Sequence, residues 1–414
     1  MQICIYEDAK YQNFYPLSYS RPVYDLVCGV RSLKEKILAD FPEAKLSLHC
    51  RKYLEELSRL NNPDKTVNKI KGDKCLFING RVLNHGDLKK LLGTAEKKDC
   101  IYKNGEDIVA VSLSGMYLEK IKSNFPDVLN FENLPGIPHI NTEIKVANYL
   151  WDLISENGEQ LSFDIKFLAG QSEYYKVQSD FSAVNFVNPD LILVGSNVTI
   201  KPGVVIDATN GPVLIDNNAF IFPNAVIEGP VYIGKYSKIK SGATIYENVS
   251  IGNVCKVGGE LEDTVILPFS NKQHTGFIGH SYLGSWVNLG AATNCSDLKN
   301  NYGRVKVMLN GKSVDTGLQF LGLIAGDHSK SAINTMFNTG TIIGFSSNIF
   351  GAGFPDKYIP SFSWGGSENI STYDLKKGIE TAKIVMKRRE IDFSTEDEKL
   401  FKYIFDLTAS ERNE

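Results

Sequence analysis

The sequence lacks the features that identify several large classes of protein. No apolar run among its 414 residues approaches the ~20 residues of a membrane-spanning helix, so we expect no membrane partner. The seven cysteines are scattered and include no Cys-x-x-Cys pair, which argues against a disulfide scaffold and against a cysteine-rich zinc site. This cysteine usage fits a reducing, cytoplasmic setting best.

Neither sign of charge dominates the chain. Its 45 Lys and Arg residues and 48 Asp and Glu residues give a formal charge of −3. A protein held on nucleic acid by its overall field carries far more positive charge, so we expect no nucleic-acid partner. The glycine-rich phosphate loops G-x-G-x-x-G and G-x-x-x-x-G-K-[ST] are also missing. Any charge that binds phosphate must therefore be local.

A six-residue repeat runs through the middle of the chain. An aliphatic residue recurs at every sixth position, and one three-residue insertion interrupts the series. The frame holds eleven aliphatic positions, namely Val194, Ile200, Ile206, Ile215, Ile221, Ile227, Ile233, Ile239, Ile245, Ile251 and Val257. A period of six fits neither an α-helix nor one long strand, and it is typical of a coil of short strands joined by tight bends. Glycine placement agrees, because 24 of the 35 glycines lie between residues 191 and 370.

The repeat divides the chain into three expected regions. Residues 1–184 show mixed α/β signals, with short buried strands at MQICIY, CLFING and IVAVSL. Residues 185–370 hold the coil, and residues 371–414 carry the apolar spacing and the Ser394 start signal of a helical tail. Further helices are expected over 32–39, 51–60 and 143–154, a linker over 157–184, and a protruding loop over about 293–317.

Three of the six histidines fall in the coil, at His274, His280 and His328. His274 lies where the six-residue frame is interrupted, and a neutral imidazole there suits a base that deprotonates an amine or hydroxyl near pH 7. A surface or structural histidine is an equally good interpretation of its position alone. A zinc site made by all three histidines is disfavoured, because His274 and His280 are six residues apart and fall on successive faces.

Other polar segments are candidates for substrate binding. Near His274, Glu260 follows two glycines and could orient a catalytic histidine or solvate a turn, and Lys272 is a further candidate. The segment T-N-C-S-D-L-K-N-N-Y-G-R could hold a sugar and a phosphate or form an ordinary hydrophilic loop. Its candidate residues are Asp297, Lys299, Asn300, Asn301 and Tyr302. In the first domain, Arg21 beside Pro22 suits a phosphate ligand or a structural turn.

Several stretches together carry a family resemblance over most of the chain. They include S-R-P-V-Y-D-L, F-I-N-G-R, C-K-V-G-G-E, N-K-Q-H-T-G-F-I-G-H-S-Y-L-G-S-W-V-N-L-G-A-A-T-N and S-F-S-W-G-G. The chain resembles a variant, Bacteroidetes-type branch of the bifunctional N-acetylglucosamine-1-phosphate uridylyltransferase/glucosamine-1-phosphate acetyltransferases. The resemblance implies an α/β nucleotidyltransferase-like domain, a left-handed parallel β-helix with hexapeptide repeats, and a homotrimer.

The resemblance also implies roles for three residues in the coil. His274 matches the family's acetyl-transfer base, Glu260 matches its acidic partner, and Asn288 matches the asparagine of the family's N-I-G-A-G-T run. The expected substrates are a sugar 1-phosphate, a nucleoside triphosphate and acetyl-CoA. This sequence departs from the family at Glu262, where a sugar-phosphate-binding lysine is usual, and at Phe277, where a tyrosine is usual.

The first domain departs further from the family pattern. Where the family has a glycine-rich loop, this sequence reads E-D-A-K-Y-Q-N, which contains no glycine. Gly80-Arg81 replaces the strand-end aspartate that the family uses to hold Mg²⁺. We therefore expect Arg21, Arg31, Lys34 or Arg81 to supply positive charge for phosphate binding, and the metal dependence stays open.

Two alternatives compete with a bifunctional enzyme. One is a nucleotidyltransferase whose coil only forms the trimer, and the other is a non-catalytic protein that binds sugar nucleotides.

Overall fold

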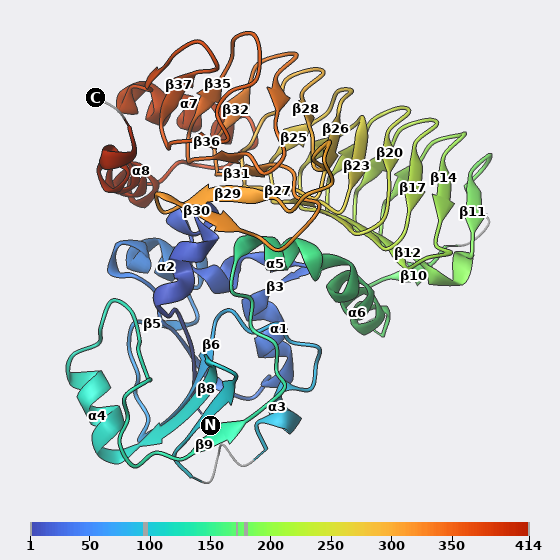
Figure 1. Ribbon diagram of the computed structural model, residues 1–414. Helices are drawn as coiled ribbons and strands as arrows, with labels where there is room; N and C mark the ends of the chain where they lie inside the picture. Colours follow the sequence, from blue (N-terminus) through green and yellow to red (C-terminus); the bar gives the residue numbers. More distant parts are fainter. Residues whose placement is uncertain (1, 94–97, 171–172, 178–180, 413–414) are drawn as a thin grey trace. The chain divides into compact units, whose positions relative to one another are not determined.

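The computed structural model describes residues 2–93, 98–170, 173–177 and 181–412. These residues form two compact units (Figure 1). Unit 1 holds the described residues up to Phe14 together with Ser18–Leu26 and Arg31–Leu150, and unit 2 holds Tyr15–Leu17, Val27–Val30 and the described residues from Trp151 onward. The expected domain boundaries after residues 184 and 370 stay a prediction.

Unit 1 is built on a seven-stranded mixed sheet. Its strands, in spatial order, are β5 (Thr66–Val67), β4 (Lys45–Leu48), β1 (Gln2–Tyr6), β6 (Lys74–Asn79), β8 (Asp107–Ser114), β7 (Cys100–Asn104) and β9 (His139–Asn141). Strand β1 runs parallel to both β4 and β6, whereas β8 is antiparallel to β6. The carboxyl ends of β1 and β6 therefore lie on the same edge of the sheet, beside the amino end of β8.

Unit 1 contains four α-helices among its described residues, and the first begins at a local capping signal. They are α1 (Leu33–Asp40), α2 (Glu55–Asn61), α3 (Leu88–Leu91) and α4 (Gly115–Ser123). Helix α1 begins after Ser32, whose hydroxyl accepts a hydrogen bond from the Glu35 N–H at 3.2 Å while the Glu35 carboxylate accepts from the Ser32 N–H at 2.7 Å. This reciprocal capping satisfies two backbone donors at the helix start.

Unit 2 is dominated by a coil whose short strands stack into three sheets (Figure 1). The first contains β10 (Tyr175–Lys176), β12 (Ile192–Val194), β15 (Val213–Ile215), β18 (Val231–Ile233), β21 (Val249–Ile251), β24 (Val265–Ile266), β27 (Tyr282–Leu283), β31 (Ile324–Ala325), β34 (Ile342–Ile343) and β36 (Tyr358–Ile359). The second contains β11 (Asn185–Val187), β14 (Val205–Asp207), β17 (Val226–Glu228), β20 (Thr244–Ile245), β23 (Glu260–Glu262), β26 (Phe277–Gly279), β28 (Asn294–Cys295) and β33 (Met336–Phe337).

The third sheet has two parts. One part contains β13 (Thr199–Ile200), β16 (Phe220–Ile221), β19 (Lys238–Ile239), β22 (Lys256–Val257) and β25 (Asn271–Lys272). The other contains β32 (Lys330–Ser331), β35 (Asn348–Ile349), β37 (Ser363–Gly365) and β38 (Ile370–Thr372). Asn288 joins the two parts, since it forms parallel bridges to Asn271 on one side and Lys330 on the other. The coil therefore has three continuous faces.

The coil interior explains the six-residue period. Successive aliphatic residues of the frame fall on different sheets, as Ile215, Ile221 and Ile227 do, and each stacks on the residue one turn further along. All eleven aliphatic positions of the frame are buried in one hydrophobic cluster. The predicted fold class, an α/β domain followed by a left-handed parallel β-helix with a helical tail, is confirmed.

The tail contains α7 (Leu375–Lys387) and α8 (Thr395–Leu407). Ser394 caps α8, because its hydroxyl accepts from the Asp397 N–H at 3.1 Å. The polar stretch predicted as a loop includes an antiparallel hairpin of β29 (Lys306–Leu309) and β30 (Lys312–Asp315). Among the described residues, no helix is both long and apolar enough to span a bilayer.

Two sequence-based expectations about helices differ from the structure. The helix expected over 143–154 is confined to α5 (Leu150–Ser155), because the preceding segment instead forms a bridge between Val146 and Val82. The segment expected to be a linker contains α6 (Asn157–Ala169), which packs Leu161 and Ile165 against the coil residues Leu193 and Leu214. Residues 171–172 and 178–180 of that segment lie outside the described part of the chain.

Candidate active sites

In unit 1, polar residues gather at the sheet edge where β1 and β6 end. Glu7 and Asp8 follow β1, and Arg81 follows β6 after Gly80. Ligands of open α/β sheets bind outside the carboxyl ends of parallel strands, so this edge is the first candidate site.

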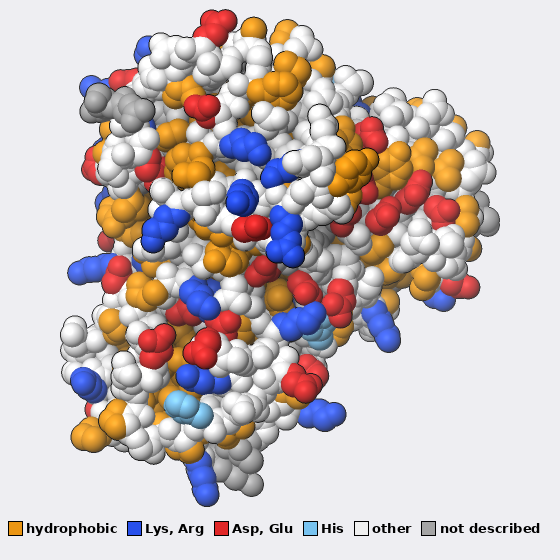
Figure 2. Space-filling model, viewed as in Figure 1, with side chains coloured by type: hydrophobic (Ala, Val, Ile, Leu, Met, Phe, Trp, Pro, Cys, Tyr) orange, Lys and Arg blue, Asp and Glu red, His pale blue; other side chains and the backbone are white. Residues whose placement is uncertain are grey.

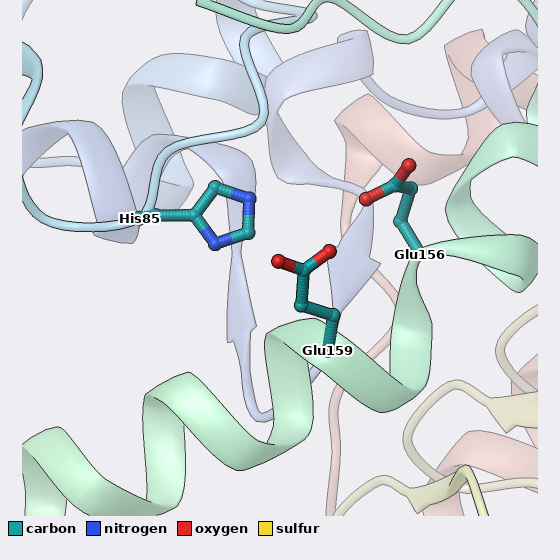
Figure 3. A group of neighbouring side chains, drawn as sticks. All are labelled: His85, Glu156 and Glu159. Atoms are coloured by element: carbon teal, nitrogen blue, oxygen red, sulfur yellow. The ribbon is translucent and has the colours of Figure 1, made fainter.

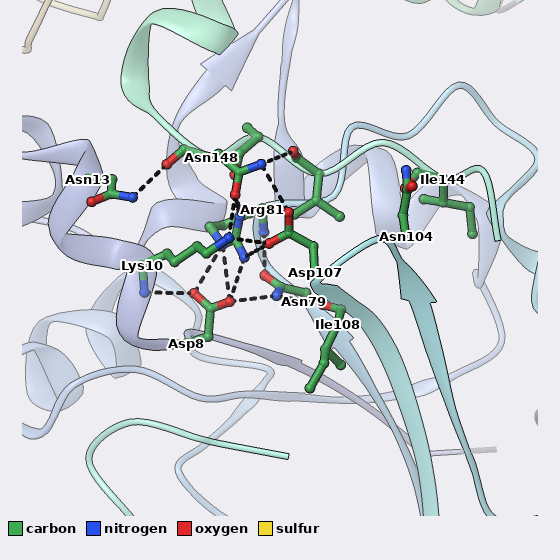
Figure 4. Close-up of polar contacts among 12 residues, drawn as sticks. Asp8, Lys10, Asn13, Asn79, Arg81, Asn104, Asp107, Ile108, Ile144 and Asn148 are labelled. Atoms are coloured by element: carbon green, nitrogen blue, oxygen red, sulfur yellow. Dashed lines mark hydrogen bonds and ion pairs between the residues drawn. The ribbon is translucent and has the colours of Figure 1, made fainter. Parts of the chain in front are cut away.

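The Arg81 side chain is the centre of this edge (Figure 4). Its Nε and Nη2 donate to the two carboxylate oxygens of Asp8, at 3.0 and 2.6 Å, and Nη2 also donates to Asp107 Oδ1 at 3.0 Å. Nη1 donates to the carbonyl of Ala147 and to Asn148 Oδ1. The guanidinium side chain is 2% exposed. Its donors are thus directed at the protein itself, and the phosphate contact expected of Arg81 stays a prediction.

Lys10 is a second cation at this edge, and we call the group of Asp8, Lys10, Arg81 and Asp107 the cage. Lys10 Nζ lies 2.7 Å from Asp107 Oδ1 and 2.7 Å from Asn148 Oδ1. Burial raises the pKa of Asp107, but its hydrogen bonds from Lys10, Arg81 and Asn148 outweigh burial and hold the pKa below its usual range. The two carboxylates of the cage, Asp8 and Asp107, are therefore matched by two cations.

The cage does not fit a bound Mg²⁺. Mg²⁺ prefers carboxylate oxygens in a near-octahedral shell that keeps several waters. Here both carboxylates already accept hydrogen bonds from Arg81 or Lys10, and an arginine stands at the strand end where the family places the metal-binding aspartate. We therefore derive no chemical step through a metal held by these residues.

The segment that carries Arg21 is held by a buried ion pair. Arg51 donates from Nε to Glu7 Oε2 and from Nη2 to Glu7 Oε1, both at 3.1 Å, and both side chains are at most 1% exposed. Arg51 Nη2 also donates to the Arg21 carbonyl at 2.9 Å, and Glu7 accepts from the Val23 N–H. The Arg51–Glu7 pair thus fixes the main chain on both sides of Pro22.

The other predicted phosphate ligands of unit 1 differ in their surroundings. Lys34 Nζ forms an ion pair with Asp25 at 2.6 Å and donates to Asn62 Oδ1 at 2.9 Å. Arg31 and Arg21 are both half-buried. The predicted phosphate contacts of all three residues stay predictions.

In unit 2, the proposed acetyl-transfer residues lie on neighbouring turns of the coil. Glu260 begins β23 and pairs in register with Phe277 of β26, three residues after His274. His274 lies in an exposed bend between β25 and β26. Its side chain has no hydrogen-bond partner in the described ranges. Asn288 Oδ1 accepts from Asn271 Nδ2 at 3.4 Å, and Asn271 belongs to β25, the strand that precedes the His274 bend. The three roles stay predictions.

The sequence reasoning missed a polar cluster around His280. His280 Nδ1 lies 2.8 Å from Asp297 Oδ2, and Nε2 lies 3.5 Å from Asp263 Oδ2. Burial lowers the pKa of His280, but the Asp297 hydrogen bond and the Asp263 charge outweigh it, so the pKa is raised. The Phe320 ring stacks on the imidazole at 5.0 Å. Asp297, a candidate for sugar and phosphate binding, therefore pairs with a histidine. The only sequence signal for this pair is its separation of 17 residues, which is one turn of the coil.

The remaining predicted residues of the polar segment lie in its turn. Lys299 Nζ donates to the Arg304 carbonyl, Asn301 Oδ1 accepts from the Gly303 N–H at 3.0 Å, and Asn300 is exposed. Tyr302 is 68% exposed. These contacts shape the turn, and the predicted substrate contacts stay predictions.

Lys272, predicted as a substrate ligand, is buried, and its predicted substrate contact stays a prediction. Its side chain is 1% exposed, and its ammonium donates to the main-chain carbonyls of Gly258 and His274. The ammonium therefore points into the coil, because strand β25 presents this position to the interior.

The coil histidines do not converge on a common point. His280 lies between two aspartates, and His328 is stacked on Trp286 and packed edge-on against Phe345.

Elsewhere, Figure 3 shows the carboxylates of Glu156 and Glu159 at the beginning of α6. His85, drawn with them, belongs to the other unit, and we assign no metal site to the three. Figure 2 shows basic and acidic side chains interspersed over the face in view.

Comparisons with known proteins match both units. A family model described as sugar nucleotidyl transferase matches residues 3–173, and one described as bacterial transferase hexapeptide, with six repeats, matches residues 212–247.

Two curated relatives extend across most of the chain. A bifunctional sugar-1-phosphate nucleotidylyltransferase/acetyltransferase of Sulfurisphaera tokodaii is 26% identical over 78% of this chain and 85% of its own length. A bifunctional protein GlmU of Methanococcus vannielii is 26% identical over 69% of this chain and 72% of its own length. Among solved structures, an Arabidopsis UDP-N-acetylglucosamine acyltransferase matches 56% of this chain and 93% of its own, at 13% identity and a TM-score of 0.29.

Proposed function

This chain is a transferase that joins a sugar nucleotidyl transferase domain to a hexapeptide-repeat acyltransferase-like domain, and we propose that each domain catalyses one step of nucleotide-sugar synthesis. The observation that carries the proposal is the alignment with a relative named for both activities, which spans 366 residues and hence both domains. The coil would acetylate an amino-sugar 1-phosphate, and unit 1 would join a sugar 1-phosphate to a nucleoside triphosphate. UDP-N-acetylglucosamine is the product that the resemblance implies.

In the proposed acetyl transfer, the sugar amine attacks the thioester carbon of acetyl-CoA. The C–N bond forms, the C–S bond breaks, and CoA leaves as a thiolate, which then takes up the proton that His274 removes from the amine. His274 takes the proton that the amine loses, which is the role that an exposed imidazole near neutral pH serves best. Glu260, on the adjoining turn, would orient the imidazole, and backbone N–H groups of the coil would stabilise the oxyanion.

In the proposed nucleotidyl transfer, the phosphate of the sugar attacks the α-phosphorus of the nucleoside triphosphate and displaces diphosphate. Arg21, Arg31 and Lys34 would neutralise the charge that develops on the phosphates. The Arg81–Asp8–Asp107 cage would hold the sheet edge rigid. We further propose a homotrimer in the cytoplasm, where seven free, buried thiols are stable.

The test uses the full-length chain and two independent assays. Glucosamine 1-phosphate with acetyl-CoA should release free CoA thiol, and the protein's own thiols give little background because all seven are buried. A panel of sugar 1-phosphates with each nucleoside triphosphate should release diphosphate for one pairing. Diphosphate without thiol release would favour the coil as a trimerisation scaffold, and tight sugar-nucleotide binding with neither product would favour a non-catalytic protein.

A further inference from the structure

Lys272 occupies a position where the preceding turns of the coil bury an aliphatic side chain. In successive turns of the third face, Ile221, Ile239 and Val257 stack in register, and Lys272 is the next residue in that column. Burial in this apolar column lowers the pKa of Lys272 to about 8. A buried ammonium is costly unless its donors are satisfied, so its partners explain why a lysine can stand here.

The partners of the ammonium are two main-chain carbonyls on different turns. Nζ lies 2.6 Å from the carbonyl oxygen of His274 and 3.0 Å from that of Gly258. His274 lies in the bend after β25, and Gly258 lies two residues before Glu260 at the start of β23. One buried side chain therefore bridges the bend that carries His274 and the turn that leads into Glu260.

The two turns approach so closely that a glycine is required between them. Gly259 has φ +75°, and a Cβ there would lie 2.7 Å from the His274 carbonyl oxygen and 2.7 Å from Lys272 Nζ. Both the backbone conformation and the contact exclude a side chain. The Lys272 ammonium thus lies where the two turns come into contact.

We propose that Lys272 is a positioning residue that holds the His274 bend against the turn preceding Glu260. This inference rests on the proposed acetyl transfer. It assigns Lys272 no contact with substrate. Without the ammonium, two carbonyls at the contact lose their donor, the bend separates from its neighbour, and the main chain no longer holds His274 in place beside the reacting amine. Orientation affects the chemical step more than substrate affinity.

The variant Lys272→Met removes the ammonium and approximately retains the side-chain volume. We expect kcat for acetyl transfer to fall at least tenfold, with KM for both substrates within about threefold and nucleotidyl transfer unchanged. The matched control is Lys330→Met, because Lys330 Nζ also donates to the carbonyl of a histidine two residues away, His328, at 2.8 Å. That control should keep kcat within about twofold.

A second variant covers the case in which Lys272→Met does not fold. Gly259→Ala places a Cβ between the two turns and should give the same fall in kcat. Its control is Gly242→Ala, which has a similar φ of +65° but no atom within 4 Å of the added Cβ, so it carries the backbone strain without the clash. Equal losses in Gly259→Ala and Gly242→Ala would contradict the proposal.

A double-variant comparison separates positioning from general stability. If Lys272 acts through His274, kcat of Lys272→Met/His274→Ala should equal kcat of His274→Ala alone, whereas two independent effects would multiply. Amide hydrogen exchange should also rise in residues 273–276 and 258–260 of Lys272→Met. A multiplicative loss or unchanged exchange overturns the proposal. A wild-type chain without acetyl transfer overturns the proposed function instead, and the exchange measurement still decides whether Lys272 holds the two turns together.

Discussion

Arg81 donates to both carboxylate oxygens of Asp8, with Nε 3.0 Å from Oδ1 and Nη2 2.6 Å from Oδ2. The two residues are 73 positions apart and meet because β1 and β6 are parallel neighbours whose carboxyl ends share one edge. A planar guanidinium matches a carboxylate in this two-point geometry, which an ammonium cannot reproduce. The pair is thus the anchor of the sheet edge in unit 1.

Replacing Arg81 should destabilise unit 1 strongly. In Arg81→Met, the Asp8 and Asp107 carboxylates lose a buried partner, and breaking such a pair costs about 3–5 kcal/mol. Urea unfolding monitored by a probe in unit 1 measures the change. The control is Lys10→Met, which removes another cation from Asp107 but is 43% exposed, so it should cost less than about 1 kcal/mol. Equal costs for the two variants would contradict the structural role of Arg81.

The neutralised cage should not bind a divalent cation by itself. Asp8 and Asp107 are matched by Arg81 and Lys10, so Mn²⁺ would have to displace a cation from each carboxylate. We expect no nucleotide-free Mn²⁺ binding at up to ~1 mM, measured by electron paramagnetic resonance on the wild-type chain. Stoichiometric binding that Asp8→Asn abolishes would show that the cage is a metal site after all.

Acid should destabilise unit 1 through His49. This imidazole is fully buried, with Nδ1 accepting from the Glu7 N–H at 3.3 Å and Nε2 donating to the Pro126 carbonyl at 2.9 Å. Burial lowers its pKa to about 4. Between pH ~6.5 and about 4, the unfolded chain binds a proton that the folded state excludes, so stability falls by about 3 kcal/mol as the pH drops.

The control for this effect is His49→Gln, which removes the titrating group. Its free energy of unfolding should depend less on pH between 4 and 6.5 than that of the wild-type chain. Parallel pH profiles for the two proteins would show that His49 is protonated in the folded state.

His274→Ala should abolish most acetyl transfer while nucleotidyl transfer persists. Loss of a general base lowers kcat by ~10²–10⁴-fold. The CoA-thiol assay measures the first activity, and diphosphate release from the same preparation measures the second. Thr275→Ala, at the neighbouring exposed position in the same bend, is the matched control and should retain activity. Thiol release that survives in His274→Ala would move the base elsewhere in the coil.

Local signals predicted much of the fold. The strands at the start of the chain, before Gly80 and at 108–113 are found as β1, β6 and β8, and the Ser32 and Ser394 caps start α1 and α8. The linker prediction missed α6, because this helix owes its stability to packing on Leu193 and Leu214. Such packing partners lie on other elements and leave no local trace.

The coil follows from local sequence alone, because its rule is one buried aliphatic residue for each six-residue strand and bend. The break in that frame, together with the family resemblance, also made His274 the candidate base. The contacts of the charged residues depend instead on the three-dimensional fold. Arg81 meets Asp8 across 73 residues, His280 meets Asp297 across 17, and Lys272 meets Gly258 across 14. A charged side chain interacts with the polar groups that the fold places beside it, and the spacing of residues along the chain does not identify that carboxylate or carbonyl.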